Sequence, residues 1–452
     1  MGLMGIYNRL PVFLQNVAFS AAGANIQRTR FGKGFDEKLQ EFESHLNWDR
    51  GRLLEWRDAQ LRQLIKHAYE TVPYYHRVMD EGGVNPDSIR SGDDLKRLPV
   101  LTKQMVRDDP ESFRSSKISE MRILPVHTSG TTGSSFRFDS TLDCQQAQFA
   151  CFWRCYRQHG LDFDTWQAQF SSRGVVPQTQ KRPPFWRVDL LGKRYYMSAF
   201  HESERNLGAY YKLVASKRIR WISGYPSLIA LLAQWMNRHD LRFDHVDVVS
   251  CGAENLLEWQ VAAMHKAFGV DPIETYGQTE NVAIFSKQPD GKILVDEDFS
   301  VVEFEKADSS SKYSVIGTSL FNYATPLIRY KTTDLVTLGD LSGNRREVAA
   351  IDGREEDYIA LPSGEKVGKL DHVFKDTSHF VEAQIAQFKD YSIELRVVGD
   401  PAECAEDEAI ALHELEKSIG DSLSVSFKYY ESIPRTRSGK LRFVVSDVDK
   451  KR

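Results

Sequence analysis

The residues best suited to chemistry form a short loop, 128–135, in which every side chain is small or carries a hydroxyl group. Gly130 and Gly133 can adopt positive φ, which lets main-chain N–H groups converge on one point. The flanking residues 122–127 and 136–138 are typical of strands, so the loop is predicted to be the turn of a β-hairpin. Converging donors without bulk suit a polyphosphate, and an ordinary polar turn is the alternative. The hydroxyl donors are Thr128, Ser129, Thr131, Thr132 and Ser134.

The loop differs from the P-loop of kinases and GTPases. That motif ends in Gly-Lys-Ser/Thr at the start of a helix, whereas Gly133 is followed by Ser134 and no lysine is near. A kinase or GTPase is therefore not favoured. A phosphate site built on this loop must take its cation from a distant part of the sequence.

Composition limits the class of protein. A chain of 452 residues fits two or three domains. The net charge of −4 and the lack of a basic block argue against nucleic acid as a partner. Five cysteines without CxxC or Cys/His spacing make a zinc site or a disulfide framework unexpected. We therefore expect a folded protein of the reducing cytoplasm.

Residues 10–22 are fairly apolar but too few to span a bilayer. We expect an amphipathic helix packed on the main domain and no stable membrane insertion. Loose association with a membrane surface is the alternative. Residues 50–81 have helical periodicity that is interrupted at 71–75.

From residue 218 onward, short apolar strands alternate with helices. This alternation predicts a parallel sheet covered by helices, whose ligands bind at the carboxyl ends of the strands. The predicted strands are 219–223, 245–251 and 272–276, and the predicted helices are 228–236 and 256–268.

Two of these strand ends carry candidate binding residues. Small residues there let a flat base approach the main chain, and Tyr276 offers a ring for stacking. Glu280 is a carboxylate in a turn where Mg²⁺ and phosphate could meet. Plain turns are the alternative. The candidates are Gly252, Ala253 and Glu254 after the second strand, and Tyr276, Gly277, Thr279 and Glu280 after the third.

The C-terminal part supplies an acid and a cation. Residues 301–341 are typical of antiparallel strands, and Asp334 near their end could accept hydrogen bonds from ribose hydroxyls. A charged turn at 351–357 then precedes a tail of helices and strands. Lys440 follows Gly439 at the tip of a basic turn and could be the distant cation that the first loop lacks. A surface aspartate and a solvated lysine are the alternatives.

Five segments occur in an order that resembles the adenylate-forming superfamily, which includes acyl-CoA synthetases and nonribosomal adenylation domains. The resemblance covers the chain from about residue 90 to its end. Residues 7–12 and 224–227 look like the phenylacetate-CoA ligase branch, most of all its CapK-like members, which are associated with capsular polysaccharide biosynthesis. The five segments are 128–134, 252–254, 276–280, 330–334 with Gly353-Arg354, and 434–440.

The resemblance implies an α/β (α+β multidomain) fold. Residues 1–352 would form a large domain of helix-covered β-sheets, with 1–90 as a helical extension, and 353–452 a small mobile α+β lid. ATP phosphates would bind Thr128, Ser129, Gly130, Thr131, Thr132 and Gly133. The nucleoside would bind Gly252, Ala253, Glu254, Tyr276, Gly277, Asp334 and Arg354. Thr279, Glu280 and Lys440 would be catalytic, with Glu280 also binding Mg²⁺.

The implied reaction is ATP-dependent activation of a carboxylic acid to an acyl-adenylate, with release of pyrophosphate. The carboxylate attacks the α-phosphorus, and Mg²⁺ and Lys440 offset the repulsion between anions. The acyl group would then pass to CoA, a carrier-protein thiol or an amine. A nucleotidyltransferase that retains AMP on its product, and a nucleotide-binding protein without catalysis, are the alternatives.

Three departures from the family pattern bear on this reaction. The sequence 331–334 is Lys-Thr-Thr-Asp where the family commonly has Arg-x-Gly-Asp, and the aspartate is kept. Residues 355–357 replace the usual hinge Asp-Asp pair. The chain after Tyr358 lacks the glycine-rich loop of many CoA ligases, which weakens the expectation of thioester formation more than that of adenylation.

Overall fold

The structure is a computed structural model that describes residues 7–127, 137–171, 175–307, 311–354, 358–363, 366–367, 370–374, 377, 379–420, 423–436 and 440–448. Its contacts divide the chain into two compact units. The first unit contains Met1–Ala21, Phe163–Ile273 and Gly353–Arg452, and the second contains Ala22–Asp162 and Glu274–Asp352. The predicted boundary at residue 352 coincides with the end of the second unit. The division into a large domain and a lid stays a prediction.

Helices of the second unit follow the predicted periodicity. The Asp49 side chain accepts a hydrogen bond from the Arg52 N–H and caps the first of two consecutive helices. Val72 is extended and Pro73 opens the next helix, so the interruption predicted near 71–75 is confirmed. The helices are α3 (Lys33–Ser44), α4 (Arg50–Thr71), α5 (Pro73–Glu81), α6 (Lys103–Asp108) and α7 (Leu142–Gln158).

The strands of the second unit form a hairpin and a mainly antiparallel sheet. In the hairpin, β1 (Ile123–His127) pairs with β2 (Arg137–Thr141), and His127 lies opposite Arg137. The flanks of the loop 128–135 are therefore strands, as predicted. The sheet runs in the order β11-β12-β13-β14-β10-β9-β8. Its strands are β8 (Ile273–Gly277), β9 (Ile284–Lys287), β10 (Ile293–Val295), β11 (Ser300–Lys306), β12 (Tyr313–Ser319), β13 (Tyr330–Ser342) and β14 (Arg345–Arg354).

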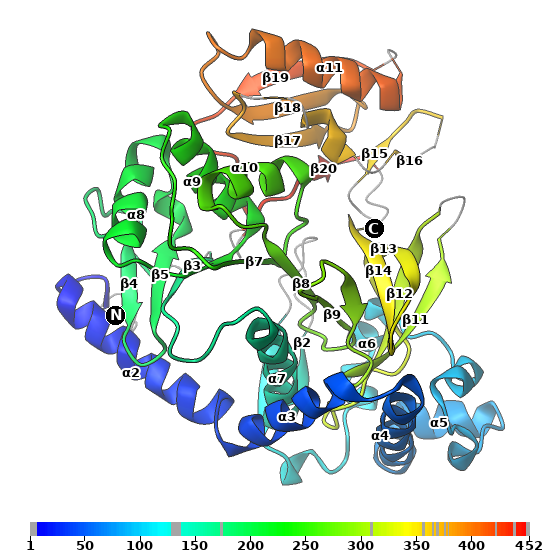
Figure 1. The fold of residues 1–452 in the computed structure, drawn as a ribbon. Coiled ribbons are helices and arrows are strands. Elements are labelled where there is room, and N and C mark those ends of the chain that lie inside the picture. The colour runs from blue at the N-terminus through cyan, green and yellow to red at the C-terminus, as the bar shows by residue number, and fades with distance from the viewer. Residues whose placement is uncertain are drawn as a thin grey trace. The chain divides into compact units, whose positions relative to one another are not determined.

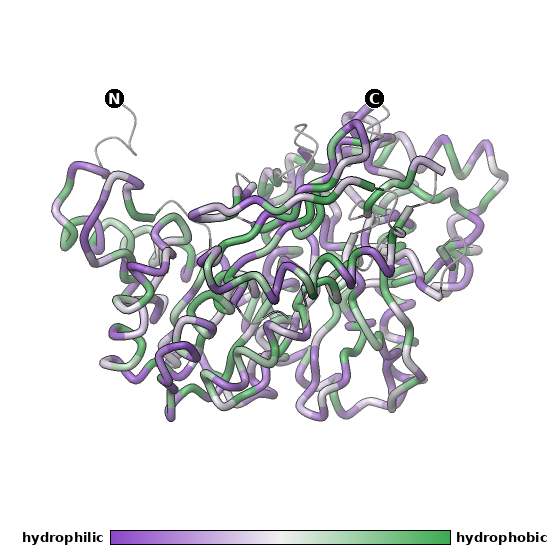
Figure 2. The backbone as a smooth tube through the Cα atoms, turned by 90° about the horizontal axis from the view of Figure 1, so that it is seen from above, coloured by the Kyte–Doolittle hydropathy of each residue, from purple (hydrophilic) through white to green (hydrophobic). Residues whose placement is uncertain are grey.

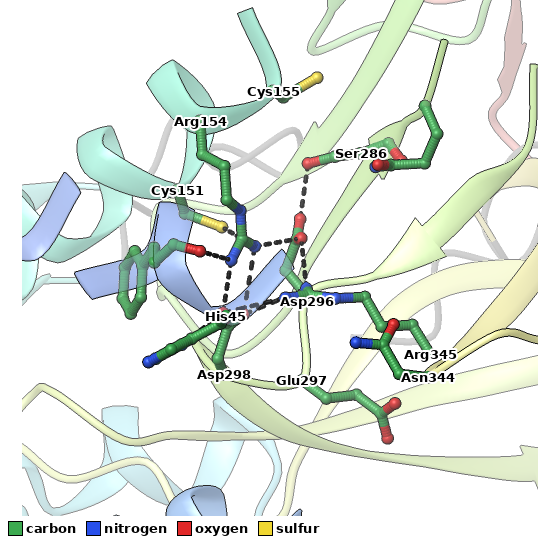
Figure 3. A network of polar contacts seen from close by, with 12 residues as sticks. His45, Cys151, Arg154, Cys155, Ser286, Asp296, Glu297, Asp298, Asn344 and Arg345 are labelled. Atoms are coloured by element: carbon green, nitrogen blue, oxygen red, sulfur yellow. Dashed lines mark hydrogen bonds and ion pairs between the residues drawn. The ribbon is translucent and has the colours of Figure 1, made fainter. Parts of the chain in front are cut away.

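A buried charge cluster joins elements of the second unit (Figure 3). Arg154 of α7 donates to Asp296 at 2.6 Å and also pairs with Asp298, and Arg345 of β14 donates to both carboxylates at 3.0–3.1 Å. His45 Nδ1 lies 2.9 Å from Asp298. Despite burial, the two guanidinium groups hold the pKa of Asp298 well below its usual range. Two buried cations and two buried anions thus connect a helix with the sheet.

The first unit contains the predicted alternation of strands and helices. Its strands run in the order β7-β6-β3-β5-β4, with β3 parallel to β5 and β6, β6 parallel to β7, and β4 antiparallel to β5. These are β3 (Gln167–Ser171), β4 (Trp186–Asp189), β5 (Arg194–Ser198), β6 (Trp221–Gly224) and β7 (Val248–Gly252). The parallel order of β6 and β7 confirms that prediction for this pair.

Helices α8 (Glu204–Ser216), α9 (Pro226–Arg238) and α10 (Glu258–Phe268) share one hydrophobic core with these strands. Pro226 opens α9, and Gly269 ends α10 with φ of +77°. At Gly224, φ is +142° and a Cβ would lie 1.8 Å from the Phe170 carbonyl oxygen. Only glycine therefore fits at the end of β6.

Residues from 359 to 444 have a core of their own. A four-stranded sheet in the order β19-β18-β17-β20 packs against α11 (Figure 1, orange and red). The elements are β15 (Ile359–Ala360), β16 (Lys366–Val367), β17 (Glu382–Gln387), β18 (Ile393–Val398), α11 (Ala405–Ile419), β19 (Val425–Tyr429) and β20 (Val444–Ser446). The strands predicted at 392–398 and 424–430 and the helix predicted at 407–419 are present as β18, β19 and α11. The helix predicted before them is not found in the described residues, where Leu370–Phe374 form a 3₁₀ turn and Glu382–Gln387 form β17.

The apolar segment near the N-terminus, predicted as a helix at 10–22, lies mostly within α2 (Val12–Arg30). In the part of the chain that the structure describes, no helix has the length and hydrophobicity to cross a bilayer. Hydrophobic and hydrophilic residues are interspersed along the described chain (Figure 2). Short 3₁₀ turns complete the structure at His45–Asn47, Pro86–Ser88, Gly92–Arg97, Pro110–Phe113, Ile118–Glu120, Ala199–His201 and Leu370–Phe374.

Candidate functional site

Tyr276 and Asp334, predicted separately, meet in the second unit. The Tyr276 hydroxyl at the end of β8 donates a 2.6 Å hydrogen bond to Asp334 in β13 and accepts one from the Gln278 amide at 2.6 Å. The Tyr276 ring stacks on Phe285 with centroids 4.6 Å apart. Burial, and then the Asp334 charge, raise the pKa of Tyr276 well above its usual range, so the phenol remains a donor. The Asp334 carboxylate is held in a fixed position.

The turn after β8 holds the other candidates of this strand end. Gly277 lies where a Cβ would come 2.8 Å from the Phe152 ring, so the position requires a small residue. Thr279 is exposed and Glu280 is half-buried. The Tyr330 hydroxyl donates to Glu280 at 3.4 Å. The turn therefore offers a hydroxyl to solvent and a partly oriented carboxylate beside it.

Glu280 is also the residue predicted to bind a metal ion. Among the described residues, no group of three or more His, Cys, Asp and Glu side chains is arranged to hold one. Mg²⁺ commonly binds proteins through one or two carboxylates together with substrate phosphates and water. Glu280 could therefore supply one ligand to a Mg²⁺ ion that is also bound by phosphates and water, but not to a site whose ligands all come from the protein.

Glu254, predicted to border a base, has main-chain partners in the first unit. It follows β7 after Ala253, whose φ is +68°. Its carboxylate accepts hydrogen bonds from the N–H of Leu441 at 2.7 Å and from the N–H of Ser227 at 3.2 Å. Burial raises the pKa of Glu254, and the charge of Arg435 opposes that rise. Gly252 ends β7, as expected for a strand end.

The predicted lysine lies in the turn that Glu254 holds. The Lys440 N–H donates to the Thr436 hydroxyl at 3.1 Å, and the Thr436 N–H donates to the Lys440 carbonyl at 3.0 Å. Arg435 donates to the Ser227 hydroxyl at 2.8 Å and pairs with Glu382 of β17. The Lys440 turn is thus bonded on both sides to residues that follow β6 and β7.

In the first unit, the Arg435 guanidinium interacts electrostatically with Glu202, Glu254 and Glu382. Burial raises the pKa of Glu202 well above its usual range; the charge of Arg435 opposes this rise, and the charges of Glu382 and Glu254 add to it. Neither carboxylate oxygen of Glu202 has a hydrogen-bond partner among the described residues. The neutral form of Glu202 is therefore favoured next to the Lys440 turn.

Several predicted residues cannot be placed. Thr128, Ser129, Gly130, Thr131, Thr132 and Gly133 lie outside the described residues, as do residues 355–357. Arg354 ends β14, and its side chain is also outside that part of the structure. Gly353 has φ of +91°, and a Cβ there would lie 2.2 Å from the Asn255 amide. Sequence reasoning missed Ser227, Glu382 and Arg435 as partners, although Ser227 and Arg435 lie in segments that carried the resemblance.

Comparison with solved structures identifies the class of fold. The 2-hydroxyisobutyryl-CoA ligase in its postadenylation state, in complex with 2-HIB-AMP, superposes with a TM-score of 0.65 over 86% of this chain and 89% of its own, at 18% identity. The chain therefore has the fold of the adenylate-forming ligases, a mixed α/β fold with a small C-terminal part, as predicted.

Comparison with known sequences identifies its relatives. Protein CapK of Staphylococcus aureus is 23% identical over 98% of this chain and 99% of its own length. The phenylacetate-coenzyme A ligase of Aromatoleum evansii is 27% identical over 68% of this chain and 72% of its own. Residues 359–447 match the CapK C-terminal domain family. The chain is a relative of CapK and of the phenylacetate-coenzyme A ligases, which confirms the resemblance drawn from the five segments.

Proposed function

We propose that this protein activates a carboxylic acid with ATP, forming an acyl-adenylate and releasing pyrophosphate. The observation that best supports this proposal is the hydrogen bond from the Leu441 N–H to Glu254. It holds the turn of Lys440 against the segment that follows β7, where the family resemblance expects the nucleotide. The proposal is further supported by the relatives, whose names describe them as acid–CoA ligases.

In the proposed mechanism, each described residue has a separate task. Asp334, oriented by Tyr276, accepts hydrogen bonds from the ribose hydroxyls. Thr279 contacts the α-phosphate and Glu280 contributes a ligand to Mg²⁺, which would neutralise phosphate charge. Lys440 follows the negative charge that moves onto pyrophosphate as the acid attacks the α-phosphorus. By the family resemblance, Gly252, Ala253, Tyr276 and Gly277 would border the base, Arg354 would assist Asp334, and residues 128–133, which lie outside the described residues, would bind the phosphates.

Glu254 has a different task in this proposal from the one that the resemblance implied. Its carboxylate is bonded to two main-chain N–H groups, so it acts as a positioning residue for the Lys440 turn. Ser227 and Arg435 support the same turn from its other side. A lysine held by its neighbours in this way loses less conformational freedom when it meets the phosphates.

The acyl acceptor is CoA or another thiol or amine in this proposal, and a role in polysaccharide biosynthesis follows from the resemblance to CapK-like proteins. The experiment is a screen of acids for ATP-dependent pyrophosphate release. The panel combines aromatic acids, short 2-hydroxy acids and sugar acids, each with ATP and Mg²⁺ and with a no-acid control. We expect pyrophosphate to be released only when a suitable acid is present, and free AMP to be released when an acceptor is then added.

Two other outcomes separate the alternatives. AMP that stays covalently on the final product after acceptor addition would identify a nucleotidyltransferase. ATP binding without pyrophosphate release for any acid would identify a nucleotide-binding protein without catalysis. Either result would replace the proposed function.

A further inference from the structure

The first half of α2 contacts the protein through polar residues and Phe19, and most of its other large apolar residues face solvent. Gln15 is 3% exposed, and its side-chain oxygen accepts from Arg187 of β4 at 2.5 Å. Asn16 accepts from the Val188 N–H at 3.1 Å. Ser20 donates to the Val188 carbonyl at 3.2 Å. Polar side chains of α2 therefore bond the helix to β4, the edge strand of the sheet in the first unit.

The opposite face of this helix is apolar and exposed. Phe13 is 65% exposed and Val17, one turn further, is 62% exposed. Leu14, Ala18 and Ala21 are also exposed. A helix that served only to cover the sheet would have the reverse arrangement.

A second apolar element lies beside this face. The turn between β4 and β5 carries Leu190 and Leu191 at its tip, 60% and 61% exposed. The Leu190 N–H donates to the Ser20 hydroxyl at 3.1 Å, which fixes the turn against α2 (Figure 1, lower left). Of the eight large apolar side chains that are exposed in the described part of the chain, five belong to these two elements. Such clustering marks an interaction surface, whereas single exposed apolar residues do not.

Within the two segments that carry this surface, the exposed or half-exposed charges are all positive. None of the first 35 residues of the chain is acidic. In 7–21 and 175–194 the exposed or half-exposed charged side chains are cations, and the acid in these segments, Asp189, is buried and accepts from the Gly192 N–H. The cations are Arg9, Lys181, Arg182, Lys193 and Arg194. A protein of net charge −4 thus has a positive border around an apolar patch.

We propose that α2 and the β4–β5 turn form a docking surface for an anionic lipid bilayer. Phe13, Leu14, Val17, Leu190 and Leu191 would enter the boundary between headgroups and acyl chains, and the surrounding Lys and Arg side chains would contact lipid phosphates. The protein would then bind one leaflet without crossing it. The positive border favours this occupant over a second copy of the chain, whose corresponding surface would carry the same charge.

Sedimentation with lipid vesicles tests the docking surface. The full chain is mixed with vesicles of phosphatidylcholine alone or with about one third phosphatidylglycerol, at low and high salt. Binding should be at least about tenfold tighter to the anionic vesicles and should weaken as salt increases. Leu190→Ser with Leu191→Ser, and separately Phe13→Ser with Val17→Ser, should each lower the affinity by about tenfold or more. Leu341→Ser, which removes a leucine that is 59% exposed in the second unit, is the matched control and should bind as the parent does.

Each outcome supports or overturns the proposal. Circular dichroism and thermal unfolding verify that each of the two double variants is folded. Because the two pairs of substitutions lie on different elements, one double variant suffices if the other fails to fold. Absence of binding to anionic vesicles, or binding by the folded variants that is as tight as binding by the parent, would overturn the proposal. Light scattering that shows a dimer which both pairs dissociate would assign the surface to a second copy and would also overturn it. No arm of this experiment depends on the proposed adenylation.

Discussion

The main-chain N–H of Leu441 donates a hydrogen bond of 2.7 Å to the carboxylate of Glu254. Because Leu441 directly follows Lys440, this bond fixes the main chain of the lysine that is proposed to be catalytic. A second N–H, that of Ser227, binds the other carboxylate oxygen at 3.2 Å. Glu254 is therefore bonded to two segments that are far apart in the sequence.

Replacing Glu254 tests this positioning. Glu254→Ala removes both acceptors, so the Lys440 turn should lose its attachment, and kcat for adenylation should fall by about 10- to 100-fold with a smaller change in KM for ATP. Hydrogen exchange at the amides of residues 440 and 441 should accelerate in the variant. Glu416→Ala, at an exposed position of α11, is the control. An unchanged kcat together with faster exchange would show that the attachment is irrelevant to catalysis.

The Tyr276–Asp334 pair leads to a prediction about nucleotide affinity. Tyr276→Phe keeps the ring on Phe285 and removes the donor that orients Asp334. The loss of one hydrogen bond should raise KM for ATP by about 3- to 10-fold and leave kcat nearly unchanged. Tyr75→Phe is the matched control, because it deletes a buried hydroxyl bonded to the Pro326 carbonyl at 2.9 Å. An equal change of KM in both variants would show that the Tyr276–Asp334 hydrogen bond has no specific part in ATP binding.

Burial of Glu274, opposed by the charge of Lys287, raises the pKa of this carboxyl to about 7. Since the folded protein binds this proton more tightly than the unfolded chain, the contribution to stability is fully present below about pH 4.5 and is lost as the pH rises through about 7. The loss should be no more than about 3 kcal/mol, because the side chain keeps some solvent exposure. Urea unfolding across this range should show a steeper decline for the parent than for Glu274→Gln. Parallel curves for the two proteins would contradict the raised pKa.

The charge cluster of Figure 3 leads to a prediction about stability. Asp298→Asn leaves Arg154 and Arg345 with one buried carboxylate instead of two, so the free energy of unfolding should fall by about 3–5 kcal/mol. Added salt should change this loss little, because the groups are shielded from solvent. Glu37→Ala breaks an exposed pair with Lys33 and serves as the control, with no measurable loss expected. Equal stability of the two variants in chemical denaturation would contradict the prediction.

The sequence predicted elements better than it predicted partners. Periodicity located α4, α9, α10 and the strands β6 and β7 to within a few residues, because burial determines such patterns. It also predicted Tyr276 and Asp334 as site residues, although their mutual hydrogen bond depends on strand geometry that no local pattern encodes.

Sequence periodicity could not predict the polar contacts between segments that are distant in the sequence. Arg435 and Ser227 both lay in recognised segments, but their bond joins residues that are 208 positions apart. The helix predicted for residues 10–22 lies mostly within α2 (Val12–Arg30). Its polar side chains bond to β4 and Phe19 packs on Tyr196, whereas Phe13 and Val17 face solvent. One-dimensional periodicity records where apolar residues lie and does not record which side faces the core.

The most direct test of the central claim is acid-dependent exchange of radiolabelled pyrophosphate into ATP by the parent protein, by Lys440→Ala and by Lys417→Ala. Lys417 forms a surface pair with Glu414 in α11 and is the matched control. We expect exchange by the parent and by Lys417→Ala, and a loss of about 100- to 1,000-fold in Lys440→Ala with ATP still bound. Exchange by Lys440→Ala at the parental rate would show that Lys440 is not the adenylation lysine.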